Sequence, residues 1–205
     1  MPPTNPSMVH LRNMVRIAIL ASGNGSNAQR LMDHFRNHPD ARVVLVGSDK
    51  PSAGVVQRAW NSGVACYLFN GALLRDGTVQ RELLGQQIDL VVLAGFLRLV
   101  PAELVRAFPD RIINIHPALL PKFGGTGMHG HHVHEAVIAA KGTESGITIH
   151  YVNERFDEGG HIAQFKCPVL PGDTPETLAA RINELEHAHF SEVVERVIPL
   201  LVTGL

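Results

Sequence analysis

Short apolar runs that end at polar or glycine-rich turns constrain the fold of this chain more than any other feature. Three of them are MVRIAILA at residues 14–21, ARVVLVGSD at residues 41–49 and IDLVVLAG at residues 88–95. The third is apolar almost throughout, which is typical of a strand buried on both faces. Strands of this kind that alternate with helices predict an α/β fold with a parallel sheet.

The segments between these runs have helical periodicity. Behind the first run, apolar residues recur at the i, i+3, i+4 and i+7 spacing of one helix face, at Ala28, Leu31, Met32 and Phe35. AGVVQRAWNSG predicts a shorter helix that Gly63 closes, and VACYLF predicts the next strand. Strands and helices therefore alternate, as parallel pairing requires.

The second half of the sequence predicts an antiparallel extension of the sheet. RIINIH, residues 111–116, has the pattern of a strand, and a loop at residues 117–131 and a helix near residues 133–141 follow it. SGITIHYVNERFDEGGHIAQFKCPVL then contains two alternating stretches around a turn, with the spacing of a hairpin. We expect a single-domain Rossmann-like sheet with a parallel N-terminal half and an antiparallel C-terminal extension.

A long helix is expected near the end of the chain. Asp173 can cap it, Pro175 suits its first turn, and Glu176 would complete a capping box. Pro199 is expected to end it. The apolar seam of this helix comprises Leu178, Ile182 and Leu185.

The composition is that of an ordinary globular protein. Of 205 residues, 45% are hydrophobic and 18% are charged, and the formal net charge is −1. This balance gives no electrostatic reason to expect nucleic acid or membrane binding, and no apolar run reaches the roughly 18 residues of a spanning helix. We expect a disordered leader at residues 1–14 and the folded domain at residues 15–205. Cys66 and Cys167 have no CxxC partner, so we expect reduced thiols in a cytoplasmic protein.

The glycine-rich turn SGNGSN follows the first predicted strand. GNGSNA matches the GxGxxA pattern of dinucleotide sites, and Asp49 follows the second strand as the acidic residue of such a site would. A dinucleotide site and a purely structural turn are therefore alternatives. Asn24, Ser26 and Asn27 add side-chain donors near a helix N-terminus, which suits a terminal phosphate monoester better. We favour a phosphorylated small molecule as the ligand.

RIINIHPALLP places Asn114 and His116 on the same face of a strand, where Pro117 turns the chain. An amide donor beside an imidazolium could form an oxyanion hole for acyl transfer. A nearby carboxylate would favour the charged imidazole, and the candidate is Asp157 in the turn FDEGG, with Glu158 as its local rival. No serine or cysteine adjoins His116, so direct transfer between two bound substrates is favoured over a covalent acyl-enzyme.

Five motifs, in order and at similar spacing, closely resemble the phosphoribosylglycinamide formyltransferases, the folate-dependent glycinamide ribonucleotide transformylases of purine (IMP) biosynthesis. They are ILASGNGSN, VVLAGFLRLV, IINIHPALLPKF, ITIHYVNERFDEGGHIAQ and ELEHAHF, and the resemblance spans about residues 15–201. It implies transfer of a formyl group from 10-formyltetrahydrofolate, as co-substrate, to the amine of glycinamide ribonucleotide (GAR). It also implies direct transfer through a tetrahedral intermediate.

The resemblance implies roles for individual residues. The catalytic trio falls on Asn114, His116 and Asp157. The GAR phosphate would lie on Gly25, Ser26 and Asn27, and the ribose hydroxyls on Glu186. The folate would lie against Leu97, Leu99 and Val100, with Arg98 in the same segment and Arg75 facing the glutamyl tail.

The segment FGGTGMHGHHVHEA, residues 123–136, departs from the resemblance because it is longer than the corresponding loop. It contains four histidines, His129, His131, His132 and His134. Histidine clusters can bind metal ions, but only Glu135 is close in sequence to complete a shell. We favour a substrate loop, and no metal site is expected. His150, on the strand before Asp157, could face the site or be an ordinary strand histidine.

Alternative functions stay open at this point. They are a 10-formyltetrahydrofolate deformylase-like hydrolase and a non-catalytic nucleotide-binding protein. A methionyl-tRNA formyltransferase would need an additional nucleic-acid-binding domain after Leu205, and a deformylase usually has a regulatory domain before its catalytic half. The expected partners are small-molecule substrates, with neither nucleic acid nor membrane, for a monomer or homodimer.

Overall fold

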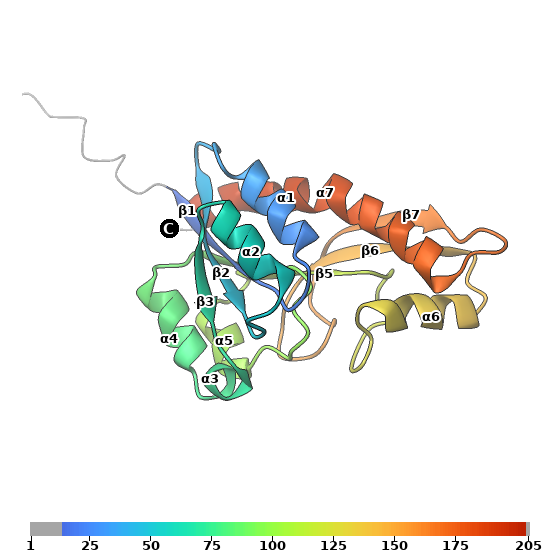
Figure 1. The fold of residues 1–205 in the computed structure, drawn as a ribbon, viewed down its shortest axis with the longest axis horizontal. Coiled ribbons are helices and arrows are strands. Elements are labelled where there is room, and N and C mark those ends of the chain that lie inside the picture. The colour runs from blue at the N-terminus through green and yellow to red at the C-terminus, as the bar shows by residue number, and fades with distance from the viewer. Residues whose placement is uncertain (1–13, 204–205) are drawn as a thin grey trace, which may run out of the picture.

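Seven strands form one mixed sheet in the order β3-β2-β1-β4-β5-β6-β7 (Figure 1). The computed structural model describes residues 14–203, so the predicted leader lies, except for Met14, outside the described residues. The strands are β1 (Val15–Leu20), β2 (Ala41–Ser48), β3 (Ala65–Leu68), β4 (Leu90–Leu93), β5 (Ile112–His116), β6 (Glu144–Tyr151) and β7 (His161–Pro168). The first five pair in parallel, whereas β6 runs antiparallel to β5 and β7. Both parts of the predicted sheet are confirmed.

Helices cover both faces of the sheet and enclose two hydrophobic cores (Figure 1). They are α1 (Ser26–His34), α2 (Gly54–Asn61), α3 (Gly71–Arg75), α4 (Thr78–Gly85), α5 (Ala102–Ala107), α6 (His131–Ala139) and α7 (Pro175–Thr203). Alternate residues of a strand point to opposite faces. Ile17 and Ile19 of β1 accordingly pack in the core with α1, α2, α6 and α7, whereas Ala18 and Leu20 pack in the core with α3, α4 and α5. The apolar runs of the sequence are thus strands buried on both sides.

The strand order reverses at β1, which has β2 on one side and β4 on the other. In open sheets of this kind, ligands bind beyond the carboxyl ends of the strands at this point. The glycine-rich turn after β1, the segment after β4 and the turn after β5 all leave the same edge of the sheet. The topology therefore gathers the predicted site segments at one place.

The start and end of α7 differ from the predictions. Thr174, rather than Asp173, caps the helix: its Oγ1 accepts a hydrogen bond from the Thr177 N–H (3.3 Å), and its own N–H donates to Thr177 Oγ1 (2.9 Å). Asp173 instead accepts two hydrogen bonds from Arg181, at 2.7 and 3.1 Å. The capping box is therefore one residue later than predicted, because a stronger charged partner takes the aspartate.

Pro199 does not end α7, which continues to Thr203. Val197 and Ile198, directly before the proline, are buried in the core, and Leu201 packs against it. Apolar packing of the last turns thus offsets the backbone hydrogen bond that a proline cannot make. Among residues 14–203, none of the helices combines the length and the apolar character needed to span a membrane.

Candidate active site

A cavity of about 640 Å³ lies beyond the carboxyl ends of the central strands. It brings together nine of the residues that the sequence predicted for the site: Asn27, Leu97, Arg98, Leu99, Val100, Asn114, His116, Asp157 and Glu186. These residues come from segments that are up to 159 positions apart, as the hydrogen bond between Asn27 and Glu186 shows. Gly25, Ser26 and Arg75 do not line the cavity in this structure.

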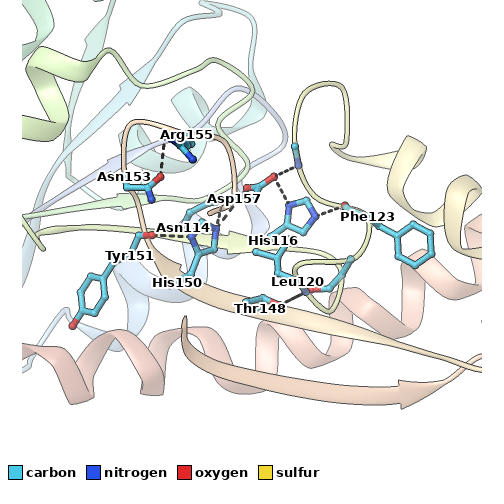
Figure 2. Close-up of polar contacts among 12 residues, drawn as sticks. Asn114, His116, Leu120, Phe123, Thr148, His150, Tyr151, Asn153, Arg155 and Asp157 are labelled. Carbon is cyan, nitrogen blue, oxygen red and sulfur yellow. Dashed lines mark hydrogen bonds and ion pairs between the residues drawn. The ribbon is translucent and has the colours of Figure 1, made fainter. Parts of the chain in front are cut away.

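His116 is buried at the end of β5, and its two ring nitrogens have different partners (Figure 2). Nε2 lies 2.8 Å from the carbonyl oxygen of Phe123. Because a carbonyl can only accept, Nε2 carries the hydrogen. Nδ1 lies 3.6 Å from Oδ2 of Asp157, too far for a hydrogen bond, and the two form an ion pair only when the ring is protonated.

The protonation states of this pair follow from burial. Burial lowers the pKa of His116 below its ordinary value, although the charge of Asp157 acts in the opposite direction. Burial alone would raise the pKa of Asp157, but His150, His116 and the Gly125 N–H together lower it. The lowered pKa values favour an ionised Asp157 and, without substrates, a neutral His116 near pH 7. The desolvation of the ring thus outweighs the nearby carboxylate.

His150 of β6 faces this site and fixes the orientation of the Asn114 amide (Figure 2). Its Nδ1 lies 2.8 Å from the carbonyl oxygen of Tyr151, so Nδ1 carries the hydrogen. In the neutral ring Nε2 is then left to accept a hydrogen bond from Asn114 Nδ2, at 3.1 Å. Asn114 and His150 are also register partners of β5 and β6. One N–H of the amide remains for a ligand.

Asn27 and Glu186 meet at another part of the cavity wall, where α1 begins beside α7. Nδ2 of Asn27 donates to Oε2 of Glu186 at 2.7 Å. Burial raises the pKa of Glu186, and the bond from Asn27 acts against that rise. Asn183, one turn before Glu186, also lines the cavity. Sequence reasoning missed Asn183, although its i, i+3 spacing from Glu186 places both on one helix face.

The glycine-rich turn needs Gly25 for steric reasons. Gly25 has φ +78°, and a Cβ there would lie 2.6 Å from the side chain of Val55. The turn therefore approaches α2 as closely as bare backbone allows. Gly25 and Ser26 stand directly before Asn27, at the N-terminus of α1.

The segment after β4 forms an apolar wall with a charged neighbour. Leu97 and Leu99 line the cavity and are exposed at 42% and 49%, which leaves them available to a ligand. Nε of Arg98 donates to Oδ2 of Asp49 at 2.6 Å, while Oδ1 accepts from Ser22 Oγ at 2.6 Å. Both oxygens of Asp49 are thus engaged, and this carboxylate does not stand free as a dinucleotide site would need.

Arg75 lies beside Arg98, away from the cavity lining. A Cβ built on Gly71 would be 2.9 Å from one Arg98 nitrogen and 3.1 Å from one Arg75 nitrogen. The two guanidinium groups therefore flank the same glycine. A role for Arg75 at the folate tail stays a prediction.

The histidines of residues 129–134 differ in their surroundings. Exposed His131 lies 3.4 Å from Glu135 and 3.5 Å from Glu176, and exposed His132 lies 3.0 Å from Glu135. His134 is buried, and its Nδ1 has no hydrogen-bond partner. His129, His131 and His134 line the cavity. Across residues 14–203, no group of three or more histidine, cysteine or acidic side chains is arranged to hold a metal ion.

Comparisons with known proteins agree with this geometry. The sequence pattern of the formyl transferase family matches residues 15–194. The chain is 41% identical to the chloroplastic phosphoribosylglycinamide formyltransferase of Arabidopsis thaliana over 186 residues, which cover 87% of this chain and 64% of that protein. It is 35% identical to the Bacillus subtilis phosphoribosylglycinamide formyltransferase over 194 residues, covering 91% and 96% of the two chains.

Solved structures give the same similarity. The glycinamide ribonucleotide transformylase 1 of Geobacillus kaustophilus has a TM-score of 0.82 and 37% identity, covering 90% of this chain and 99% of that one. That of Symbiobacterium toebii has a TM-score of 0.81 and 37% identity, covering 88% and 86%. The resemblance indicated by the five motifs is confirmed. The chain spans under two thirds of the plant relatives' length, 64% for Arabidopsis and 60% for Vigna unguiculata.

Proposed function

We propose that this chain, which belongs to the formyl transferase family, moves a formyl group from 10-formyltetrahydrofolate to the amine of GAR in purine biosynthesis. One observation carries the proposal: Asn114, His116 and Asp157 meet in a single cavity that also holds the Asn27–Glu186 pair. Such a site offers an oxyanion-binding group, an acid–base pair and partners for a phosphorylated sugar together.

For the acceptor, we assign the phosphate to the N-terminus of α1, at Gly25, Ser26 and Asn27. Backbone N–H groups at a helix N-terminus and the Asn27 amide suit a phosphate monoester. Glu186, held by Asn27, would accept hydrogen bonds from the ribose hydroxyls. Glu186, Asn114 and His116 line the same cavity, so a ligand held at Glu186 could present its amine to Asn114 and His116.

For the donor, we assign the folate to the wall of Leu97, Leu99 and Val100. The exposed leucines would cover the flat apolar ring, and Arg98 and Arg75 would attract the carboxylates of the glutamyl tail. The folate is a co-substrate that leaves after each turnover. No resident metal is proposed.

The transfer step is balanced in bonds and protons. The amine attacks the formyl carbon, a carbon–nitrogen bond forms, and the bond to N10 of the folate breaks. One proton leaves the amine and one is added to N10. The free N–H of Asn114 would bind the developing oxyanion. That negative charge favours protonation of His116, and Asp157 stabilises the imidazolium and takes part in the proton transfer through water.

The finer assignments follow from the same proposal. The residues named for both substrates belong to one chain, so a monomer or a homodimer would suffice. The partners proposed are small molecules, and the proposed location is the cytoplasm.

The test is formyl transfer itself, with purified protein, 10-formyltetrahydrofolate and GAR, followed by loss of the formyl donor. We expect turnover that requires GAR and is lost in Asp157→Asn. Release of formate without an acceptor would instead identify a hydrolase. No donor consumption by folded protein would contradict the proposal, and a rise in melting temperature with NAD or nucleotides would then favour a nucleotide-binding protein.

A further inference from the structure

We propose that Thr148 and Gln164 are positioning residues for His116 and Asp157, and that they act through the backbone of Leu120. The activity readout of this inference rests on the proposed function, whereas its spectroscopic readout does not. Leu120 belongs to residues 117–125, a segment without regular secondary structure that follows His116. We call the Thr148, Gln164 and Leu120 contacts the Leu120 clamp.

The clamp is a saturated hydrogen-bond arrangement around one hydroxyl. Oγ1 of Thr148 donates to the Ala118 carbonyl (2.7 Å) and accepts from the Leu120 N–H (3.0 Å) and from Gln164 Nε2 (2.9 Å). A hydroxyl has one hydrogen and two lone pairs, so all are used. Gln164 Nε2 also donates to the Leu120 carbonyl at 2.9 Å. Both backbone polar groups of Leu120 are therefore held by side chains of β6 and β7.

The register of the sheet places this clamp next to the site. His116 of β5 is the register partner of Thr148 on β6. Residues 145–150 of β6 are all buried, and Thr148 is completely inaccessible to solvent. Valine would fill the same space in a strand buried on both faces. The hydroxyl is thus explained by the backbone groups of the turn and not by packing.

The position of Leu120 affects the surroundings of Asp157 through Gly124 and Gly125. A Cβ at Gly124 would lie 2.5 Å from Cδ2 of Leu120 and 3.2 Å from Cβ of Asp157, so the glycine is enclosed between the two side chains. The following N–H, of Gly125, donates to Oδ2 of Asp157 at 2.9 Å. A shift of Leu120 would therefore displace a backbone donor of the carboxylate.

The position of Leu120 also affects His116, through the backbone carbonyl of Phe123. Phe123, three residues further on, supplies the carbonyl that holds Nε2 of His116 (Figure 2). Figure 2 shows Thr148 and Leu120 on one side of the His116 ring and Asp157 on the other. One clamped peptide thus fixes the partner of the imidazole and a partner of the carboxylate together.

The first variant is Thr148→Val, which keeps the shape and removes the hydroxyl. We expect kcat to fall by about 10- to 100-fold, with KM for each substrate changed by less than about threefold, because misplaced catalytic groups reduce the rate far more than binding. Thr148→Ser retains the hydroxyl and should restore kcat to within about threefold of the parent.

The second readout is the ¹H–¹⁵N NMR spectrum of the His116 ring, which needs no turnover. In the parent protein the proton should reside on Nε2 at neutral pH, as the Phe123 carbonyl requires. In Thr148→Val we expect a mixed tautomer signal or a shifted titration midpoint. If the parent protein transfers no formyl group, the proposed function fails, and the NMR comparison still decides this inference.

The control is Ser145→Ala, which removes another buried hydroxyl of β6 that has no hydrogen-bond partner. Its kcat and His116 spectrum should match the parent. Gln164→Met, on the edge strand β7, replaces Thr148→Val if that variant fails to fold, and a fall in kcat of about three- to tenfold is expected. An unchanged His116 spectrum in these variants would overturn the inference, whether or not kcat falls, because any loss would then be structural.

Discussion

Residues 117–125 and residues 129–135 are close in sequence, yet the structure holds them in opposite ways. The first segment is held by the buried Leu120 clamp and by the contact of Phe123 with His116. The second segment also buries Val133 and His134, but its polar link to α7 is an ion pair of His131 and Glu176, whose side chains are 48% and 71% exposed. Buried neutral hydrogen bonds persist over a wide pH range, whereas exposed charge pairs are weak and require a protonated histidine. The polar contacts of the first segment are therefore independent of pH over a wide range, whereas the polar link of the second segment to α7 depends on pH.

The largest loss of kcat is expected for a change at Asp157, the carboxylate that accepts a hydrogen bond from Gly125 at the end of residues 117–125. Asp157→Asn removes the carboxylate but keeps an oxygen that can accept from Gly125. We expect kcat to fall by about 10²- to 10⁴-fold, with little change in melting temperature. Steady-state kinetics and thermal unfolding measure the two effects.

Glu158→Gln is the matched control for that change, because Glu158 is exposed and pairs only with the exposed Arg155, among the contacts described. Its kcat should equal that of the parent. A loss smaller than about tenfold in Asp157→Asn would mean that Asp157 takes no direct part in proton transfer.

A steric change should displace residues 117–125 without touching their polar groups. Gly124→Ala would force a Cβ against Leu120 and Asp157, so we expect kcat to fall by about tenfold and stability by about 1–3 kcal/mol. Kinetics and urea unfolding test this. Gly85→Ala, at the end of α4 with open space around the new Cβ, serves as the control. Equal behaviour of the two variants would show that residues 117–125 tolerate displacement.

Acid should destabilise the folded protein through two buried histidines, His116 and His134. Burial lowers the pKa of both His116 and His134 in the folded protein, and His131 and His116 lower that of His134 further. Below about pH 6.5 the unfolded state then binds more protons than the folded state. The contribution of these histidines to the free energy of unfolding is therefore fully present above that pH and is lost as the pH falls toward their folded pKa values.

His134→Asn should make this loss shallower, by up to about 1.4 kcal/mol per pH unit for one proton. Urea unfolding at a series of pH values measures the slope. His132→Asn, which changes an exposed ring of the same helix, is the control. Identical slopes for the parent and His134→Asn would show that His134 does not contribute.

The smallest effect is expected for Glu176→Gln, which removes one of two exposed carboxylates near His131, the other being that of Glu135. Stability should change by less than about 0.5 kcal/mol, and kcat should stay within about threefold of the parent. A tenfold loss of activity would show that residues 129–135 also need a fixed position.

Much of the fold was predictable because apolar periodicity reports burial of one element at a time. IDLVVLAG predicted a strand buried on both faces, and β4 is such a strand. The helix α5 was missed, since six residues hold too few turns to show a period. The cap of α7 was misplaced because Asp173 and Thr174 are both good caps, and only the position of Arg181 separates them.

The sequence by itself determined the strand order in the chain, the shared face of Asn114 and His116, and the turn that precedes α1. These depend on local spacing, which backbone geometry fixes within a few residues. Only the tertiary structure decided the lowered pKa of His116, the pairing of Asn114 with His150 and the clamp on Leu120. Each depends on how deeply a group is buried and on hydrogen bonds between segments far apart in sequence, and no local pattern encodes either quantity.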